Sequence, residues 1–397
     1  MPVTLLLKKY RSYAFVIPSA LAGIITVLFF FNLMQSRSQT KALADNASVY
    51  QKQLIATQKE LTALKNQDQY KRNEDLQKNI KDIESTYKDT VKAYETIQDL
   101  KAQKQKTDSY DKALVQALSY LSDKNYSSAS STLTNLNKQI ASDQAKAQTA
   151  IAAAAPVSVN TPASNTPPSS GFSTQKVTTD VGEFTVAIIS ADIGSTRVIV
   201  DTASSSDCHD NCPVLSLGDY VARNGAFAGI NGSYFCPQEY PSCAGKTGSF
   251  DLLVMNKDKH YFNSDNNVYS TNPAVIFQSG SVRFVSQALQ WGRDTSVDGV
   301  LSNYPLLISG GSIVYSDSSD PKFNSRGPRG FVANKGNTVY IGFVYNATMG
   351  ESARTLKALG MENAMNLDEG GSTALWYGGY KLGPGRNIPN AILFVRK

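Results

Sequence analysis

The sequence predicts an α+β protein in which a mixed-sheet C-terminal domain is preceded by a single transmembrane helix and an α-helical coiled-coil stalk. Three observations lead to this prediction: an uncharged apolar segment near the N-terminus, a heptad repeat after it, and β-branched runs separated by turn residues in the C-terminal half. The expected segments are a cytoplasmic N-terminus (1–12), a signal-anchor helix (13–34), the stalk (38–150), a linker (151–175) and the C-terminal domain (176–397).

The apolar segment at residues 13–34 contains no charged side chain. A membrane-spanning helix needs about 20 predominantly apolar residues, and Lys8, Lys9 and Arg11 before the segment favour a cytoplasmic N-terminus. A cleaved secretory signal is the alternative, but its apolar core would be shorter. The segment therefore predicts a single-pass protein of the cell membrane, attached through this helix, with an extracytoplasmic C-terminal domain.

The stalk is predicted from apolar residues that recur in alternating steps of four and three, as in the a/d seam of a coiled coil. The seam comprises Leu43, Ala47, Tyr50, Leu54, Thr57, Leu61 and Leu64, then Leu76, Ile80, Ile83, Tyr87, Thr90, Tyr94 and Ile97. The change of phase between Leu64 and Leu76 leaves two arrangements open: a parallel coiled coil, which would make the chain a homo-oligomer, or a folded-back helical hairpin. From residue 108 a further helical hairpin is expected to cap the stalk.

The linker at 151–175 is rich in Pro, Ser, Thr and Ala, which is typical of a semi-extended segment without a core. The whole chain has a formal net charge of +6, but residues 151–397 contain eighteen basic and nineteen acidic residues. The positive charge therefore belongs to the N-terminal part. The globular part has no stripe of basic and aromatic residues, so nucleic acid is not an expected partner.

All four cysteines, Cys208, Cys212, Cys236 and Cys243, lie in the C-terminal domain. An even number of cysteines beyond a predicted membrane anchor predicts two disulfides in an oxidising compartment, and three pairings are open. The alternative is a metal site, such as a zinc site, around Asp207-Cys208-His209-Asp210 and Cys212.

Only two histidines are present, His209 and His260, which excludes multi-histidine metal centres and leaves little room for a histidine-based triad. We therefore expect the chemistry to rest on carboxylates, arginine and polar side chains, with no cofactor required and no assigned metal site. A divalent cation held by Asp368 and Glu369 is the alternative.

The C-terminal domain shows several short strands and few helices. Residues 184–193 and 196–202 are β-branched runs that predict a hairpin through Gly194. Residues 352–359 predict a helix that ends at Gly360. A buried strand at 364–367 and a last strand at 391–395 complete the expected sheet.

Four loops of this domain combine glycine with side chains suited to ligand binding. Glycine allows close approach of a ligand to the backbone, arginine forks suit phosphate, and carboxylates at a strand end suit proton transfer. The loops are Asn231-Gly232-Ser233-Tyr234, Arg326-Gly327-Pro328-Arg329, Asp368-Glu369-Gly370-Gly371-Ser372 and Arg386 to Asn390.

In this order the loops resemble the phosphodiester glycosidase family, which includes the lysosomal uncovering enzymes and bacterial proteins linked to exopolysaccharide biosynthesis. The resemblance covers roughly residues 180–397. The family elements NGGYF, PRTAIG and LDGGGS are matched in turn by Asn231, Gly232, Tyr234 and Phe235, by Pro328 and Arg329, and by Leu367, Asp368, Gly370, Gly371 and Ser372. Ser233, Gly330 and Glu369 depart from these elements.

The resemblance implies hydrolysis of the glycosidic bond of a sugar 1-phosphodiester, here in cell-envelope or exopolysaccharide glycans. Arg329 would bind the phosphodiester, Asp368 would activate water or stabilise an oxocarbenium-like centre, and Glu369 would be a second catalytic carboxylate. The residues expected to bind substrate are Asn231, Gly232, Tyr234, Arg326, Gly370, Gly371, Ser372, Arg386 and Asn390.

Two alternatives accompany this interpretation. If the family glycine at position 369 needs a positive φ, Glu369 would be strained, and the departure would mark a loss of activity. The protein would then be a non-catalytic glycan-binding or envelope scaffold protein that acts through its coiled coil.

Overall fold

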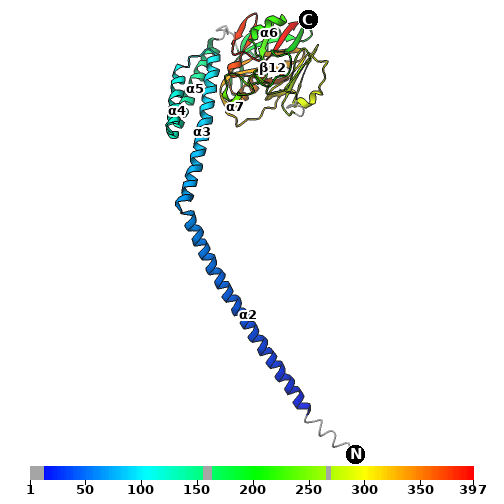
Figure 1. Cartoon of the computed structure of the whole chain (residues 1–397). Coiled ribbons are helices and arrows are strands. Elements are labelled where there is room, and N and C mark those ends of the chain that lie inside the picture. The colour runs from blue at the N-terminus through cyan, green and yellow to red at the C-terminus, as the bar shows by residue number, and fades with distance from the viewer. Residues whose placement is uncertain (1–12, 155–162, 265–269) are drawn as a thin grey trace, which may run out of the picture. The chain divides into compact units, whose positions relative to one another are not determined.

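The structure is a computed structural model and describes residues 13–154, 163–264 and 270–397. The predicted cytoplasmic N-terminus and part of the predicted linker lie outside these residues. The N-terminal half is helical and the C-terminal half is built mainly of strands (Figure 1). The helices before the sheets are α2 (Tyr13–Lys65), α3 (Asp68–Ala102), α4 (Asp108–Ser122) and α5 (Tyr126–Ala154).

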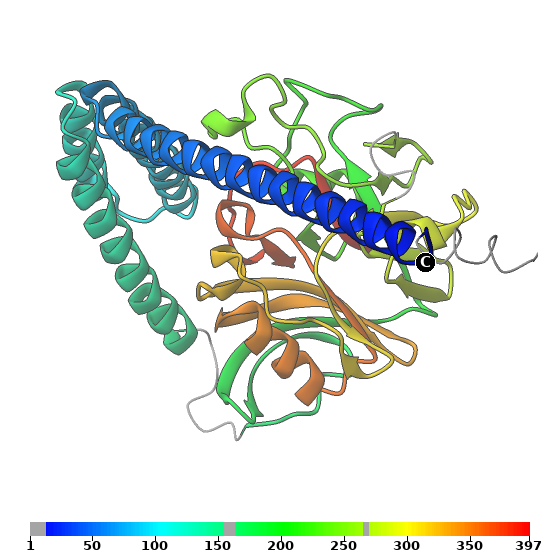
Figure 2. The same ribbon diagram turned by 90° about the horizontal axis from the view of Figure 1, so that it is seen from below.

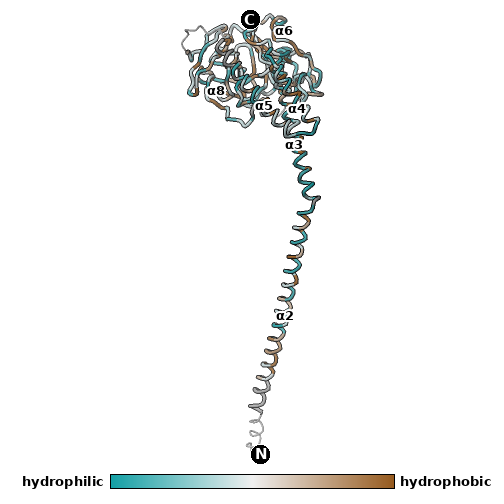
Figure 3. Tube along the Cα trace, turned by 90° about the vertical axis from the view of Figure 1, so that its left-hand side faces the viewer, coloured by the Kyte–Doolittle hydropathy of each residue, from teal (hydrophilic) through white to brown (hydrophobic). Residues whose placement is uncertain are grey.

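Helix α2 does not supply the predicted membrane span. Across the described residues, no helix combines the length and apolar character that crossing a bilayer requires. Over residues 22–34 the mainly apolar sequence of α2 also contains Thr26 and Asn32, and the helix becomes charged at Arg37. Apolar and polar stretches alternate further along the helix (Figure 3). The predictions of a transmembrane signal anchor at 13–34 and of a single-pass location in the cell membrane are therefore wrong.

The chain divides into two compact units, residues 1–82 and 83–397. In the first unit the predicted seam is solvent-exposed: Leu54, Leu61 and Leu76 are 59%, 51% and 53% exposed. Because these side chains are exposed to solvent, the described residues of the first unit (13–82) contain no folded-back hairpin along the seam. The parallel coiled coil between chains stays a prediction.

The second unit begins with a small helical bundle. The C-terminal part of α3 packs against α4 and α5, with Ile97 and Leu100 of α3 buried against Leu114 and Leu133. Apolar positions that recur every three or four residues on each helix produce this core. The bundle confirms the helical hairpin expected after residue 108.

The strands form three sheets. The first has the order β1-β2-β13-β12-β14-β10-β11; its strands are Gly171–Thr179, Gly182–Asp192, Thr338–Ala347, Gly327–Lys335, Asn363–Asn366, Leu306–Ser309 and Ser312–Ile313. The second has the order β16-β15-β4-β17-β3; its strands are Tyr380–Leu382, Leu375–Tyr377, Ala228–Asn231, Asn390–Arg396 and Thr196–Thr202. The third has the order β6-β5-β9-β7-β8; its strands are Tyr261–Phe262, Val254–Met255, Gly299–Ser302, Ala274–Gln278 and Ser281–Val285.

Strand pairing corrects the sequence-based expectation in two respects. Every pair among these strands is antiparallel, so the sheets are not mixed. Short turns such as the one between Lys335 and Thr338 join neighbouring strands, and such turns permit antiparallel pairing alone. Furthermore, β2 and β3 do not form a hairpin, because β2 pairs with β1 and β13 whereas β3 pairs with β17.

Helices cover the outer faces, and the main core lies between the sheets. Its members include Ile189 and Phe343 from the first sheet, Val200 and Ile230 from the second, and Val275 and Leu301 from the third. Helix α8 (Met349–Ala358) packs on the other face of the first sheet, as Figure 2 shows in orange. Helix α6 (Leu217–Asn224) covers the second sheet. The remaining short helices are α7 (Pro321–Asn324), η1 (Pro241–Cys243), η2 (Ala288–Trp291) and η3 (Gly370–Ser372).

The ends of α8 follow from its sequence. The Thr348 hydroxyl accepts a hydrogen bond from the backbone N–H of Glu351, and the Glu351 carboxylate accepts one from the backbone N–H of Thr348. The helix therefore starts with a capping box. Gly360 has a φ of +74° after the helix, which is the left-handed position expected there. This helix leads directly into β14 and thus into the loop that follows it. The predicted helix at 352–359 is confirmed.

Candidate active site

The loop after β14, the loop after β4 and the start of β17 meet at one place. The backbone N–H of Asp368 donates to the carbonyl of Gly232 over 2.9 Å, and the N–H of Gly232 donates to the carbonyl of Asn390 over 3.1 Å. Three of the four loops singled out in the sequence are therefore neighbours, although more than a hundred residues separate Gly232 from Asp368.

Two buried asparagines hold these loops together. Asn231 Nδ2 donates to the carbonyl of Asp368 (2.8 Å), and Asn390 Oδ1 accepts the N–H of Ser233 (2.9 Å). Gly232 is required beside them, since an added Cβ would lie 1.8 Å from Asn390 Oδ1. The side chains of Asn231 and Asn390 thus serve the framework rather than an open surface.

Asp368 is the half-buried carboxylate at the centre of the site. Burial raises the pKa of Asp368 to about 7. A hydrogen bond from Ser372, the N–H of Glu369 and the positive charge of Arg386 act in the opposite direction, because they favour the ionised form. A carboxyl group with a pKa near neutrality can release and take up a proton under ordinary conditions.

Arg329 and Glu369 form a buried ion pair beside Asp368. Their side chains are 3% and 16% exposed, and Arg329 Nη1 donates to Glu369 Oε2. The other donors of Arg329 bind backbone carbonyls: Nε binds Ala347 (2.9 Å), and Nη2 binds Lys322 (2.9 Å) and Ser325. The guanidinium of Arg329 is therefore already bonded on all three nitrogens.

The backbone at Glu369 is not strained. Its φ is −136°, an extended conformation that any residue adopts, and the positive φ of this loop falls on Gly370 at +64°. The strain considered for Glu369 from the sequence is therefore absent. Burial raises the pKa of Glu369, while Arg329 opposes this shift.

Tyr234 joins the site from the loop after β4. Its hydroxyl accepts a hydrogen bond from Asn366 Nδ2 over 2.8 Å, and its ring lies 5.1 Å from that of Tyr304, centre to centre. Burial and the carboxylates of Glu369 and Asp368 raise the pKa of Tyr234 well above its usual value. Tyr234 is thus a neutral, packed side chain of the site.

Arg326 is not among the residues brought together. Its guanidinium is 44% exposed, donates to the carbonyl of Asn346 over 2.8 Å and pairs with Glu351 at the start of α8. The guanidinium of Arg326 is therefore engaged by Asn346 and Glu351.

Arg386 is the second buried arginine of the site, with a side chain that is 5% exposed. Its backbone N–H donates to the carbonyl of Gly371 (2.7 Å), and its guanidinium lies 5.0 Å from the ring centre of Tyr240. Nη2 donates to Asp99 of α3. Burial alone would lower the pKa of Arg386, but the charge of Asp99 raises it overall.

Sequence reasoning missed Asp99 and Tyr240. Asp99 lies on the stalk helix among many regularly spaced charged residues, and Tyr240 lies outside the glycine loops. Neither position carries a local signal, because both join the site through long-range contacts with Arg386.

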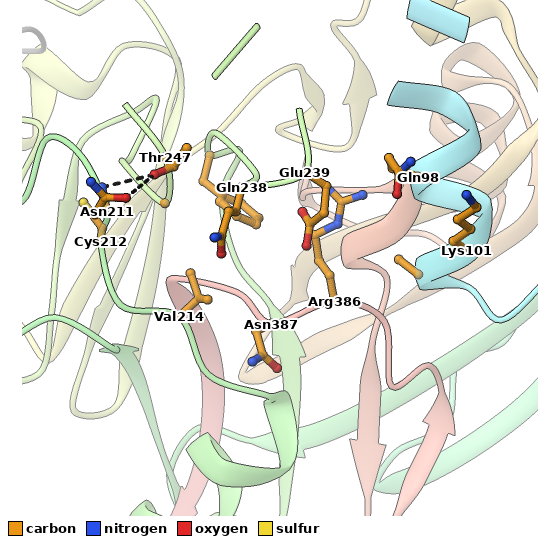
Figure 4. A pocket seen from close by; sticks show the side chains of 13 residues that line it. Gln98, Lys101, Asn211, Cys212, Val214, Gln238, Glu239, Thr247, Arg386 and Asn387 are labelled. Carbon is orange, nitrogen blue, oxygen red and sulfur yellow. Dashed lines mark hydrogen bonds between the residues drawn. The ribbon is translucent and has the colours of Figure 1, made fainter. Parts of the chain in front are cut away.

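A cavity of about 580 Å³ opens beside Arg386 (Figure 4). Gln98 and Lys101 border it from α3, and Gln238 and Glu239 border it from the loop after β4. Cavities of this size hold small ligands, and amide side chains offer both donors and acceptors to hydroxyl groups.

The cysteines form two disulfides, Cys208–Cys212 and Cys236–Cys243. This confirms the predicted disulfides and settles the pairing. Cys212 lines the cavity described above. Within the described residues there is no group of three or more histidine, cysteine, aspartate or glutamate side chains suited to holding a metal ion, so neither the zinc alternative nor a cation site at Asp368 and Glu369 gains support.

One comparison with known protein families concerns the C-terminal domain. Residues 224–395 match the family model described as phosphodiester glycosidase, which confirms the resemblance predicted from the loops for the C-terminal domain. No curated protein matches the sequence of the chain significantly.

Two solved structures match part of this chain at low sequence identity. One is the catalytic domain of zebrafish N-acetylglucosamine-1-phosphodiester alpha-N-acetylglucosaminidase, described as auto-inhibited by its pro-peptide; it has 15% identity and a TM-score of 0.45, and the match covers 59% of this chain and 87% of that one. The other is a hypothetical protein from Synechocystis, with 16% identity and a TM-score of 0.41. That match covers 57% of this chain and 62% of the Synechocystis chain, so this chain spans less than two thirds of its length.

Proposed function

We propose that the C-terminal domain hydrolyses the glycosidic bond of sugar 1-phosphodiesters. The observation that supports this most directly is the position of Asp368, a carboxyl group with a pKa near 7 that lies within the electrostatic reach of the buried Arg386. An acid–base group next to a fixed cation suits a substrate that joins a sugar carbon to a phosphate.

The reaction breaks the bond between the anomeric carbon and the bridging oxygen. Water supplies the oxygen that bonds to the sugar carbon; one of its protons stays on the new hydroxyl and the other passes to Asp368, which later releases it to solvent. The bridging oxygen leaves with the phosphate as a phosphomonoester. Phosphate is a stable leaving group, so the step depends on charge stabilisation more than on a strong acid. In this proposal Asp368 accepts the proton of the attacking water.

We assign the phosphate to Arg386 rather than to Arg329. Every guanidinium nitrogen of Arg329 already donates to Glu369 or to a backbone carbonyl. In contrast, Nε of Arg386 has no hydrogen-bond partner among the described residues. We also propose that the natural substrates are envelope or exopolysaccharide glycans with sugar 1-phosphate links, for which the polar cavity beside Arg386 provides room.

The test is release of free N-acetylglucosamine from UDP-N-acetylglucosamine by the full chain, measured as reducing sugar. We expect turnover by the wild type and its loss in Asp368→Asn. Asp258→Asn, which changes an exposed aspartate of the same domain, serves as the matched control and should keep the activity. A correctly folded wild type that releases no sugar from this or other sugar 1-phosphodiesters would contradict the proposal.

A second candidate function is a scaffold that assembles through the stalk. The observation in its favour is the exposed apolar seam of the first unit, with Leu54, Leu61 and Leu76 more than half exposed. Light scattering of the full chain would reveal a dimer or larger assembly. The double variant Leu54→Asp, Leu61→Asp should dissociate this assembly into monomers. A monomeric full chain would contradict this candidate.

A further inference from the structure

The carboxylate of Asp99 occupies the position at which an anionic ligand would meet Arg386. Its Oδ1 accepts from Arg386 Nη2, its Oδ2 accepts from the Tyr240 hydroxyl over 2.7 Å, and the backbone of Gly371 provides a further hydrogen bond. Its Oδ2 also lies 3.1 Å from the point where a Cβ on Gly370 would be, so the carboxylate rests directly over the glycine turn. A guanidinium, a hydroxyl and a backbone N–H thus converge on one anion.

Such a set of donors is suited to phosphate as well as to carboxylate. Arginine binds both groups through charge-assisted hydrogen bonds, and a glycine turn lets the backbone N–H approach them. The side chain of Arg386 is 5% exposed, and its Nε lacks a partner within the described part of the chain. A second oxygen of a larger anion can use that donor, which Asp99 leaves free.

Helix α3 contacts the domain here through polar groups. One turn before Asp99, Glu95 accepts hydrogen bonds from the N–H and the hydroxyl of Ser242. The apolar side chains of this part of α3, such as Ile97 and Leu100, are buried instead against α4 and α5. The exposed contact of Glu95 with Ser242 exchanges with water at low net cost, whereas the buried charge of Arg386 must stay paired, so an anion has to take the place of Asp99. The bundle can therefore keep its own core while the acidic face of α3 leaves the site.

We propose that Arg386, Tyr240 and the Gly371 N–H form the subsite for the phosphate group of the substrate, and that Asp99 is an intramolecular occupant which the phosphate displaces. This inference rests on the proposed function for the identity of the anion. In the structure described here the subsite is closed by α3, and access to it requires Asp99 to move.

The test measures binding of inorganic phosphate to the full chain by isothermal titration calorimetry. Asp99→Asn removes the competing charge in a side chain of the same shape. We expect it to increase phosphate affinity at least tenfold, since the apparent affinity is reduced in proportion to the fraction of molecules whose site is free. Asp89→Asn, which changes an exposed aspartate of the same helix, is the matched control and should leave the affinity as in the wild type. Arg386→Met should abolish phosphate binding both in the wild type and in the Asp99→Asn variant.

A second variant covers the case in which Asp99→Asn disturbs the fold. Glu95→Gln weakens the contact with Ser242 without touching the subsite, and we expect a severalfold increase in phosphate affinity, with a circular dichroism spectrum like that of the wild type. Affinities of Asp99→Asn and Glu95→Gln within twofold of the wild type would overturn the proposal, and so would phosphate binding that persists in Arg386→Met.

The outcome is separable from that of the proposed function. If phosphate binding depends on Asp99 and Arg386 but no sugar phosphodiester is hydrolysed, the subsite stands and the enzymatic proposal fails. If sugar is released while Asp99→Asn changes neither phosphate affinity nor turnover, the enzymatic proposal stands and the role of Asp99 fails.

Discussion

The two buried arginines of the site differ in what neutralises them. Arg329 lies at the start of β12 and bonds to Glu369 and to backbone carbonyls, all within the C-terminal domain. Arg386, in the loop before β17, has its carboxylate partner on α3, and one of its nitrogens has no partner among the described residues. A buried charge must be paired to be tolerated. The first arginine meets this need inside the domain, whereas the second is paired by Asp99 of α3, so on our proposal the first is a structural cation and the second binds the substrate.

The largest expected effect is on the chemical step beside Arg386. Asp368→Asn preserves the shape of the side chain but removes the proton acceptor, so kcat/KM should fall by about 10²–10⁴-fold, the usual contribution of acid–base catalysis. Steady-state assays of sugar release measure this change. A decrease in kcat/KM of less than tenfold would contradict the assignment of the chemical step to Asp368 beside Arg386.

Substitution of the two arginines by Met should affect stability and phosphate binding to different extents. Arg329→Met leaves Glu369 buried and unpaired, and it should lower the free energy of unfolding by about 3–5 kcal/mol. Arg386→Met should abolish phosphate binding and turnover with a smaller loss of stability, because Asp99 can return to water. Urea denaturation and activity assays on both variants test this contrast. Equal losses of stability would remove the distinction between the arginines.

A double substitution sharpens the structural side of the comparison. Replacing Arg329 and Glu369 together by Met removes both charges, and a buried ion pair replaced by apolar groups is often neutral or stabilising by about 1–4 kcal/mol. The double variant should therefore recover most of the stability lost in Arg329→Met. If it also keeps its activity, Glu369 is not catalytic; if activity is lost while the fold is intact, Glu369 has a role beyond pairing with Arg329.

The pKa of Asp368 predicts how stability changes with pH. This pKa is about 7 in the folded protein against an ordinary 3.8, so between these values the folded state holds a proton that the unfolded chain releases. The contribution of Asp368 to stability is complete when the pH is below 3.8, and it is lost as the pH rises through about 7. Asp368→Asn should therefore gain Tm relative to the wild type between pH 5 and pH 8. Thermal unfolding at both pH values tests this, with Asp258→Asn as a control that shows no such gain.

The smallest effect concerns the hydroxyl that holds Asp99. Tyr240→Phe removes one donor to this carboxylate and keeps the ring against Arg386, at a cost of about 1 kcal/mol for one hydrogen bond. The same hydroxyl would bind the phosphate, so its loss should weaken both ligands and leave the apparent phosphate affinity nearly unchanged. A large gain in affinity would mean that Tyr240 serves Asp99 alone.

The sequence was informative where a local pattern decides the structure. The glycine loops at Asn231, Asp368 and Arg386 follow or precede strands, and their clustering could be expected because strand ends of one domain converge. The disulfides followed from cysteine number and spacing, although their pairing did not, since it depends on how the loop around Cys236 folds.

Long-range pairing could not be read in this way. The run at 184–193 and the run at 196–202 are both strands, but a local pattern does not reveal that they enter different sheets. Likewise, nothing near Arg329 indicates that Glu369 pairs with it. The apolar segment at 13–34 was interpreted as a membrane span from its length and lack of charge, but among the described residues no helix is long and apolar enough to cross a bilayer.

The covalent connection between α3 and the C-terminal domain has a quantitative consequence for Asp99. A group tethered in the same chain meets its binding site at an effective concentration that is in the millimolar range for short flexible tethers, and α4 and α5 hold α3 more firmly than such a tether would. A free monovalent anion at micromolar concentration therefore competes poorly for Arg386. A ligand with many linked phosphates, or one that also fills the neighbouring cavity, binds with higher avidity and displaces Asp99 more readily. Helix α3 would therefore favour extended polymers over small metabolites as ligands.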